Sequence, residues 1–220
     1  MRTPVEIYEE YRIPPWLQMH QLRVAAVGRL LAERIPGAAV GDVVLTGLFH
    51  DMGNILKFDL SPSGPLVGLM GVENISHWQQ VQDDFARVYG SDEHVATLAI
   101  AAEIGLSNPV IDCMRGISFS HMEHIWKEGP IELQISEYAD MRVGPSGILP
   151  LRERVADLKK RSRRRWAEGH AKDMEEKFDS STALLIRIEE RLFKNMPLRP
   201  EGINDAAVVP VIEELKSYPI

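Results

Sequence analysis

The stretch LTGLFHDMGNILKF, residues 45–58, places a histidine and an aspartate side by side at the end of an apolar, helix-like run. An ionised aspartate is rarely buried unless it is paired or bound to a cation, so Asp51 requires a partner. His50 precedes it directly. An imidazole and a carboxylate one residue apart differ by about 100° around a helix, so both can reach one ion from the helix end. The stretch therefore predicts a cation site.

Two further residues of the same kinds lie on other segments with helical periodicity. His20 follows a helix start at Pro14 and Pro15, and it shares a face with the apolar positions Leu17, Val24, Val27 and Leu31. Asp140 lies on a helix predicted from about 131 to 143, next to a small alanine that allows close packing. Taken alone, His20 is also compatible with a core histidine that a hydrogen bond satisfies.

The composition is that of an ordinary globular protein. The chain has 220 residues, of which 45% are hydrophobic and 26% charged, and its net charge of −7 disfavours general nucleic-acid binding. One cysteine, Cys113, excludes an internal disulfide and favours an intracellular protein, in which it is a small buried residue. The N-terminus is too polar for a secretory signal, and no apolar run is long enough to span a membrane. We therefore expect a cytoplasmic protein.

Helical periodicity without strand-like alternation predicts an all-α fold. Residues 1–150 form the expected main domain, and residues 151–220 form a C-terminal helical extension packed on it. The finer expectations are an arm over 1–14, a helix over 39–52 ending at Gly53, a loop over 59–72, a helix over 73–89, a helix capped by Ser91, and a last long helix over 181–194.

Two more histidines are candidates for the same site. His94 lies in the first turn of a helix, where the helix dipole favours the neutral imidazole that binds metal. His121 shares a face with Met114 and Ser118 if the helical spacing continues past Gly116. Each is equally compatible with a solvent-exposed position.

The set of one histidine, a His-Asp pair and a distant aspartate resembles the HD superfamily of metal-dependent phosphohydrolases, from about residue 15 to residue 144. The resemblance implies an HD-domain-like helical bundle with additional C-terminal helices. It also implies that His20, His50, Asp51 and Asp140 bind a divalent metal ion, with Asp51 as a catalytic residue. Histidine and carboxylate ligands suit Mn, Fe, Co, Ni, Mg or Zn.

Some branches of that family hold a second ion with two added histidines. The segments EHVATLAIAAEIGL and VIDCMRGISFSH resemble the stretches concerned, which makes His94 and His121 the candidates for a second ion, with His121 displaced by about one helical turn. The family often has a lysine where this chain has Asn54. The remaining candidates for substrate phosphate contacts are Lys57, Arg23, Arg115 and Arg142.

The resemblance implies a metal-dependent phosphohydrolase that acts on a nucleotide or related small-molecule phosphate ester. The alternative is a catalytically inactive HD-type nucleotide-binding or signalling module. A third hypothesis uses the basic segment 152–165, with eight basic and two acidic residues, to bind RNA or DNA. A solvated helix with exposed charge is the simpler interpretation of that segment, because acidic residues follow it.

Overall fold

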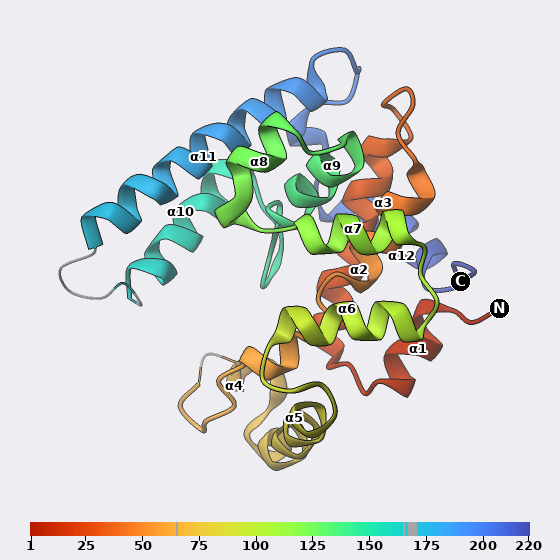
Figure 1. The fold of residues 1–220 in the computed structure, drawn as a ribbon, viewed down its shortest axis with the longest axis vertical. Helices are drawn as coiled ribbons and strands as arrows, with labels where there is room; N and C mark the ends of the chain where they lie inside the picture. Colours follow the sequence, from red (N-terminus) through yellow and green to blue (C-terminus); the bar gives the residue numbers. More distant parts are fainter. Residues whose placement is uncertain (65, 165, 167–170) are drawn as a thin grey trace.

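We describe a computed structural model of the chain, covering residues 1–64, 66–164, 166 and 171–220 (Figure 1). The described chain is predominantly helical, in agreement with the all-α expectation. Its α-helices are α1 (Pro4–Glu10), α2 (Pro15–Ala32), α3 (Val40–Phe49), α4 (Val67–Met70), α5 (Ile75–Tyr89), α6 (Glu93–Glu103), α7 (Asn108–Gly116), α8 (Met122–Lys127), α9 (Ile131–Asp140), α10 (Leu151–Arg163), α11 (Ala171–Phe193) and α12 (Asp205–Leu215). Short 3-10 turns are η1 (Asn54–Lys57), η2 (Val72–Asn74), η3 (Phe119–His121) and η4 (Pro200–Gly202).

Helices α2, α3 and α9 pack against one another at the centre of the fold. The approach of α2 to α3 is close because Gly47 lacks a side chain: a Cβ there would lie 2.6 Å from Cα of Ala25. Gly28 of α2 also allows close packing of the two helices, since a Cβ on it would lie 2.8 Å from Cγ1 of Val43. This contact brings the last turn of α3 beside His20.

Helix α3 ends three residues earlier than its periodicity suggests. It stops at Phe49, His50 is its C-cap residue, and the chain then turns through Asp51 into the short helix η1. Gly53 does not end α3 but links the following turn to α6, because its backbone N–H donates to Oγ1 of Thr97. The His-Asp pair therefore lies on a turn at the end of a helix and not within its last regular turn.

The segments expected to be irregular are more ordered than their composition indicates. Residues 4–10 form α1, whose Thr3 and Glu6 side chains make a reciprocal capping box, and Tyr8 donates to the Leu48 carbonyl oxygen at 2.6 Å. The expected loop 59–72 contains α4 and the start of η2. Asp92, and not Ser91, caps α6 by accepting from the backbone N–H groups of its first turn.

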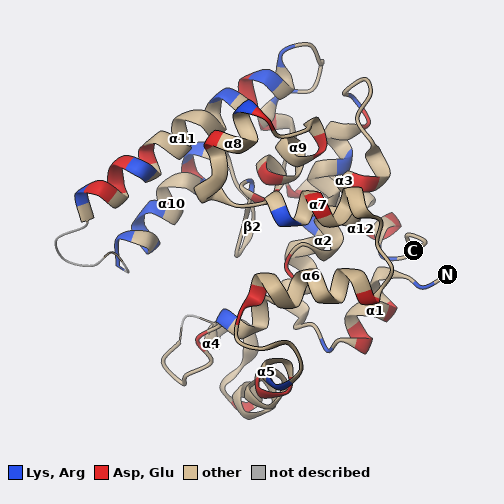
Figure 2. Cartoon of the chain, viewed as in Figure 1, with Lys and Arg blue, Asp and Glu red and all other residues tan. Residues whose placement is uncertain are grey.

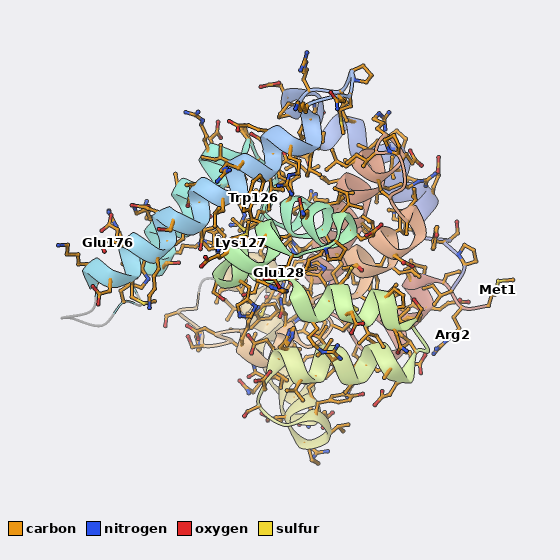
Figure 3. All side chains as sticks on the ribbon, turned by 45° about the horizontal axis from the view of Figure 1, so that its top comes forward. Met1, Arg2, Trp126, Lys127, Glu128 and Glu176 are labelled. Carbon is orange, nitrogen blue, oxygen red and sulfur yellow. The ribbon has the colours of Figure 1, made fainter. Side chains whose placement is uncertain are left out.

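The C-terminal elements pack on the main body. Helix α12 contacts α2, and α11 contacts α8 and α9. Trp126 of α8 lies against α11 (Figure 3). The guanidinium groups of Arg187 and Arg191 on α11 stand over its ring. Strands β1 (Val143–Gly144) and β2 (Gly147–Ile148) form a two-residue antiparallel hairpin, which is too small to change the fold class.

The basic helix α10 runs beside the acidic part of α11 (Figure 2). Lys159 lies 2.9 Å from Glu175 and 2.6 Å from Asp179, and Arg163 pairs with Glu175 as well. The acidic residues that follow the basic segment in the sequence thus neutralise part of its charge. Arg165, the last residue of the segment, lies outside the described residues.

No helix in the described ranges combines the length and the apolar character that crossing a membrane requires.

Candidate metal centre

Three elements bring the four residues of the sequence pattern together. His20 comes from the second turn of α2, His50 and Asp51 from the end of α3, and Asp140 from the last residue of α9. Nε2 of His20 lies 3.1 Å from an Asp140 carboxylate oxygen and 3.5 Å from one of Asp51. The helical faces inferred from sequence for His20 and Asp140 thus meet at one point.

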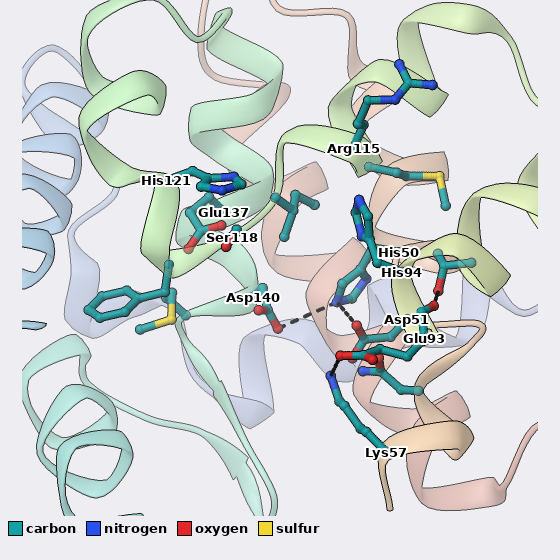
Figure 4. A pocket seen from close by; sticks show the side chains of 16 residues that line it. His50, Asp51, Lys57, Glu93, His94, Arg115, Ser118, His121, Glu137 and Asp140 are labelled. Atoms are coloured by element: carbon teal, nitrogen blue, oxygen red, sulfur yellow. Dashed lines mark hydrogen bonds and ion pairs between the residues drawn. The ribbon is translucent and has the colours of Figure 1, made fainter. Parts of the chain in front are cut away.

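His50 is oriented by its own helix. Its Nδ1 lies 3.0 Å from the Gly47 carbonyl oxygen, which can only accept, so Nδ1 carries a hydrogen and donates. Nε2 faces the carboxylates of Asp140 at 3.6 Å and Asp51 at 3.7 Å, which are beyond hydrogen-bonding distance (Figure 4). This buried Nε2 has no hydrogen-bond partner among the described residues.

The carboxylates make this point attractive to positive charge. Desolvation alone would lower the pKa of His50, but the negative charges of Asp51 and Asp140 outweigh it and raise the pKa to about 9. Desolvation alone would raise the pKa of Asp140, but its contacts with His20 and His50 hold that pKa well below its usual range. In the absence of any other cation, a proton on His50 therefore supplies the compensating charge.

These residues fit a divalent metal ion. Nε2 of His20 and Nε2 of His50 lie 3.1 Å and 3.6 Å from the same carboxylate oxygen of Asp140, and two ligands of one ion, each about 2.0–2.2 Å from it, are separated by no more than about 4.4 Å. The ligand atoms of the three residues form one compact group. Asp51 contacts both histidines but falls outside that three-residue group. A metal-binding histidine commonly donates its second ring N–H to a backbone carbonyl, as Nδ1 of His50 does, which leaves Nε2 for the ion.

A cavity of about 340 Å³ opens beside this cluster. It is lined by His50 and Asp51, which follow α3, and by residues of η1, α6, α7, η3 and α9, including Asp140. Both additional candidates, His94 and His121, line it as well, on opposite sides (Figure 4). Neither belongs to the compact group of possible ligands among the described residues.

His121 reaches the cavity by a route that helical spacing did not anticipate. Helix α7 ends at Gly116, the chain extends through Ile117 and Ser118, and η3 then carries His121. The assumption of continuous helical spacing past Gly116 is wrong, but His121 still lines the cavity beside the metal centre.

Of the four candidate contacts to the substrate phosphate, two line the cavity and two do not. Lys57 and Arg115 line the cavity, where Lys57 lies 4.0 Å from Glu93 and Arg115 pairs with Asp112. Arg23 instead pairs with Asp205 at 3.4 Å, outside the cavity lining. Asn54, which occupies the lysine position of the family pattern, is buried and lines the cavity.

Arg142, the fourth candidate phosphate contact, is buried in hydrogen bonds within the fold and does not line the cavity. It is 2% exposed, and it donates to the carbonyl oxygens of Leu149, Pro200 and Ile203 as well as to the Tyr138 hydroxyl. It lies two residues after Asp140, beyond the end of α9.

Sequence reasoning missed Glu137. It lies three residues before Asp140 on α9, it is 1% exposed, and it lines the cavity near Ser118 and His121 (Figure 4). Burial, followed by the negative charge of Asp140, raises the pKa of Glu137 to about 8. The signal was available, because residues three apart on a helix share a face.

Comparison with known proteins identified no relative: no family model matched the sequence, and neither the curated proteins nor the solved structures gave a match.

Proposed function

We propose that the chain is an HD-type, metal-dependent phosphohydrolase for a nucleotide or related small phosphate ester. The observation that carries the proposal is the orphaned Nε2 of His50, which faces two carboxylates and a second histidine drawn from three separate elements. A histidine and aspartate cluster beside a cavity is a costly arrangement unless a cation occupies it. The HD assignment itself rests on the resemblance of the sequence pattern.

Each residue has a defined part in this proposal. His20, His50 and Asp140 hold the ion, and Asp51 completes the set from the cavity side and orients the attacking water. A divalent ion held there lowers the pKa of a water molecule and offsets the charge of the phosphate. Lys57 and Arg115, both in the cavity wall, supply positive charge for the substrate phosphate.

The volume of the cavity favours a small substrate. Small-molecule sites commonly measure about 300–1,000 Å³, and the cavity of about 340 Å³ lies at the lower end of that range. A mononucleotide or sugar phosphate is of the right size, whereas a long oligonucleotide would have to extend outside it.

The decisive experiment combines metal content with turnover. The wild type and Asp51→Ala are reconstituted with each candidate metal, analysed for ions per chain, and assayed with p-nitrophenyl phosphate, bis(p-nitrophenyl) phosphate and mononucleotides. Asp83→Ala serves as the matched control, because Asp83 is an exposed aspartate on α5. We expect one ion per wild-type chain and a loss of hydrolysis in Asp51→Ala alone, with helix content unchanged.

Two other results change the conclusion. Two ions per chain would include His94 and His121 in the site. No ion in the wild type with any of the metals contradicts the enzyme hypothesis.

The inactive binding module remains the second candidate, favoured by one observation: Asn54 replaces the family lysine, and Lys57 nearby is already opposite Glu93. Tight nucleotide binding without product under any metal would support it. The nucleic-acid hypothesis is weakened by the ion pairs between α10 and α11. Binding that falls steeply with salt, and is lost when Arg163 and Arg164 are replaced, would restore it.

A further inference from the structure

Two buried, unpartnered side-chain atoms face the same cavity. Among the described residues, buried side-chain nitrogen and oxygen atoms without a hydrogen-bond partner occur at Trp16, Thr46, His50, Ser136, Glu137 and Arg154. Of these, only His50 and Glu137 line the cavity beside the metal centre. An ion accounts for Nε2 of His50, whereas Oε2 of Glu137 remains without a partner.

The free oxygen of Glu137 is costly for the fold. Burying a polar group without a hydrogen bond destabilises the folded state, and more so if the group is charged. A methionine would fill the same volume without that cost. A residue that lowers stability in the wall of a binding cavity is best explained by a ligand that supplies its partner.

A second metal ion does not provide that partner. Glu137 is not part of any compact group of three possible ligands among the described residues, although His121 and His94 line the same cavity. The phosphate group does not provide it either, because in the proposed arrangement it lies at the metal and near Lys57, on the opposite side of the cavity (Figure 4). The remaining partner is a polar hydrogen-bonding group on the organic part of the substrate.

The arrangement of the cavity agrees with a phosphate bound at one side and the organic part of the substrate at the other. His50, Asp51 and Lys57 lie on one side, Glu137, Ser118 and His121 lie on the other, and Asp140 stands between them (Figure 4). With the phosphate at the metal and near Lys57, the organic part of the ester extends toward Glu137. The Ser118 hydroxyl, which lies 2.7 Å from that of Ser120, adds a second polar group on that side.

We infer that Glu137 is a substrate-binding residue that selects phosphate esters of hydroxyl-bearing or N–H-bearing compounds, such as nucleosides and sugars, over esters of apolar alcohols. The inference rests on the proposed function for the position of the phosphate. It adds a recognition residue and a substrate property that the metal centre alone does not specify.

The test compares Glu137→Met with Glu137→Gln in the full-length, metal-reconstituted protein. Methionine keeps the volume and removes hydrogen bonding, whereas glutamine keeps one acceptor oxygen. Ser136→Ala is the control, because Ser136 is the neighbouring residue on α9, is also buried and unpartnered, and does not line the cavity. The probes are the ribonucleoside and deoxyribonucleoside 5′-monophosphates, ribose 5-phosphate and phenyl phosphate.

In the wild type, we expect the best hydroxyl-bearing ester to have a kcat/KM at least about tenfold above that of phenyl phosphate. Glu137→Met should abolish that preference, mainly through KM, while kcat/KM for phenyl phosphate changes by less than about twofold. Glu137→Gln should retain part of the preference, and Ser136→Ala should retain all of it. Metal content should be the same in all four proteins.

Other results overturn the inference. A wild type that hydrolyses phenyl phosphate as efficiently as the hydroxyl-bearing esters would contradict the selectivity that we infer. Equal losses on all esters in Glu137→Met indicate a packing role, and a loss of one ion per chain indicates a metal ligand. If the wild type hydrolyses none of the probes, the proposed function fails separately. Calorimetric affinities of the same compounds then test Glu137 by the same criterion, because hydrogen-bond recognition does not require turnover.

Discussion

Gly47 and Ala25 are in backbone contact, and this contact sets the distance between the two helices that carry the histidines. A Cβ on Gly47 would lie 2.6 Å from Cα of Ala25 and 2.7 Å from its nitrogen. The rings of His20 and His50 are 5.5 Å apart between centroids, which suits two ligands of one ion. The metal centre therefore depends on the absence of one methyl group three residues before the His-Asp pair.

Gly47→Ala should separate α2 from α3. Because the nearest atoms are backbone, the added methyl group cannot be accommodated by a side-chain rotation, and we expect a loss of at least about 2 kcal/mol in the free energy of unfolding. Chemical denaturation measures it. The control is Gly68→Ala, where a Cβ meets no atom within 4 Å. That change should be neutral or stabilise by up to about 1 kcal/mol, as alanine does in a helix. Equal effects of the two substitutions would contradict this account of Gly47.

Metal binding should release a proton. His50 has a pKa of about 9, so at pH 7 its imidazole carries a proton that an ion must displace from Nε2. We expect close to one proton released per ion, and an apparent affinity that falls about tenfold for each unit of pH below 9. Calorimetry in two buffers of different ionisation enthalpy measures the release. His124→Gln, on the exposed side of α8, should leave it unchanged. Binding without proton release would place the ion elsewhere.

The free energy of unfolding of the metal-free protein should depend on pH through the protonation of Glu137. Burial raises its pKa from an ordinary value of 4.5 to about 8, so the folded state holds the proton more tightly than the unfolded state. The resulting stabilisation is complete below pH 4.5 and is lost as the pH rises toward 8, at up to about 1.4 kcal/mol per pH unit. Glu137→Gln should therefore gain stability relative to wild type between pH 5 and pH 8 in the presence of EDTA. A constant difference between the two proteins over that range would show that Glu137 is ionised throughout.

Arg142 should be indispensable for folding. Arg142→Met removes the donors to three backbone carbonyl groups in a buried region, and we expect a loss of about 2–4 kcal/mol in the free energy of unfolding. Arg87→Met is the control, because Arg87 lies on the exposed face of α5 and pairs only with Asp84 among the described residues. Exposed ion pairs contribute little, so that change should cost less than about 0.5 kcal/mol. Thermal and urea unfolding both measure the difference.

Helical periodicity was sufficient to predict that His20, His50 and Asp140 approach one another, because each lies on or directly after a helix with an apolar face. Periodicity was insufficient where the chain leaves regular helix. The turn after Phe49 and the extended residues before η3 place Asp51 and His121 by backbone geometry that no spacing rule contains. The first helix was missed although Thr3, Pro4 and Glu6 form a recognisable N-terminal signal.

Glu137 and Arg142 show the same difference on either side of Asp140. Glu137 lies three residues before Asp140 on α9 and shares its face, whereas Arg142 follows the end of α9, so helix geometry predicts the position of Glu137 but not that of Arg142. What sequence alone does not contain is the acceptors of Arg142, which come from residues 149, 200 and 203. Long-range partners of that kind are determined by tertiary packing.

The packing of α9 against α2 and α3 also fixes when the site can form during synthesis. His20, His50 and Asp51 are made well before Asp140, and at roughly 5–20 residues per second the delay lasts several seconds. The acceptors that hold Arg142 beside Asp140 are made later still. A nascent chain therefore presents an incomplete set of the four pattern residues, and the candidate metal centre forms only when nearly the whole polypeptide has been synthesised. If the centre binds a metal ion as proposed, metal content per chain should report the fraction of molecules that have completed folding.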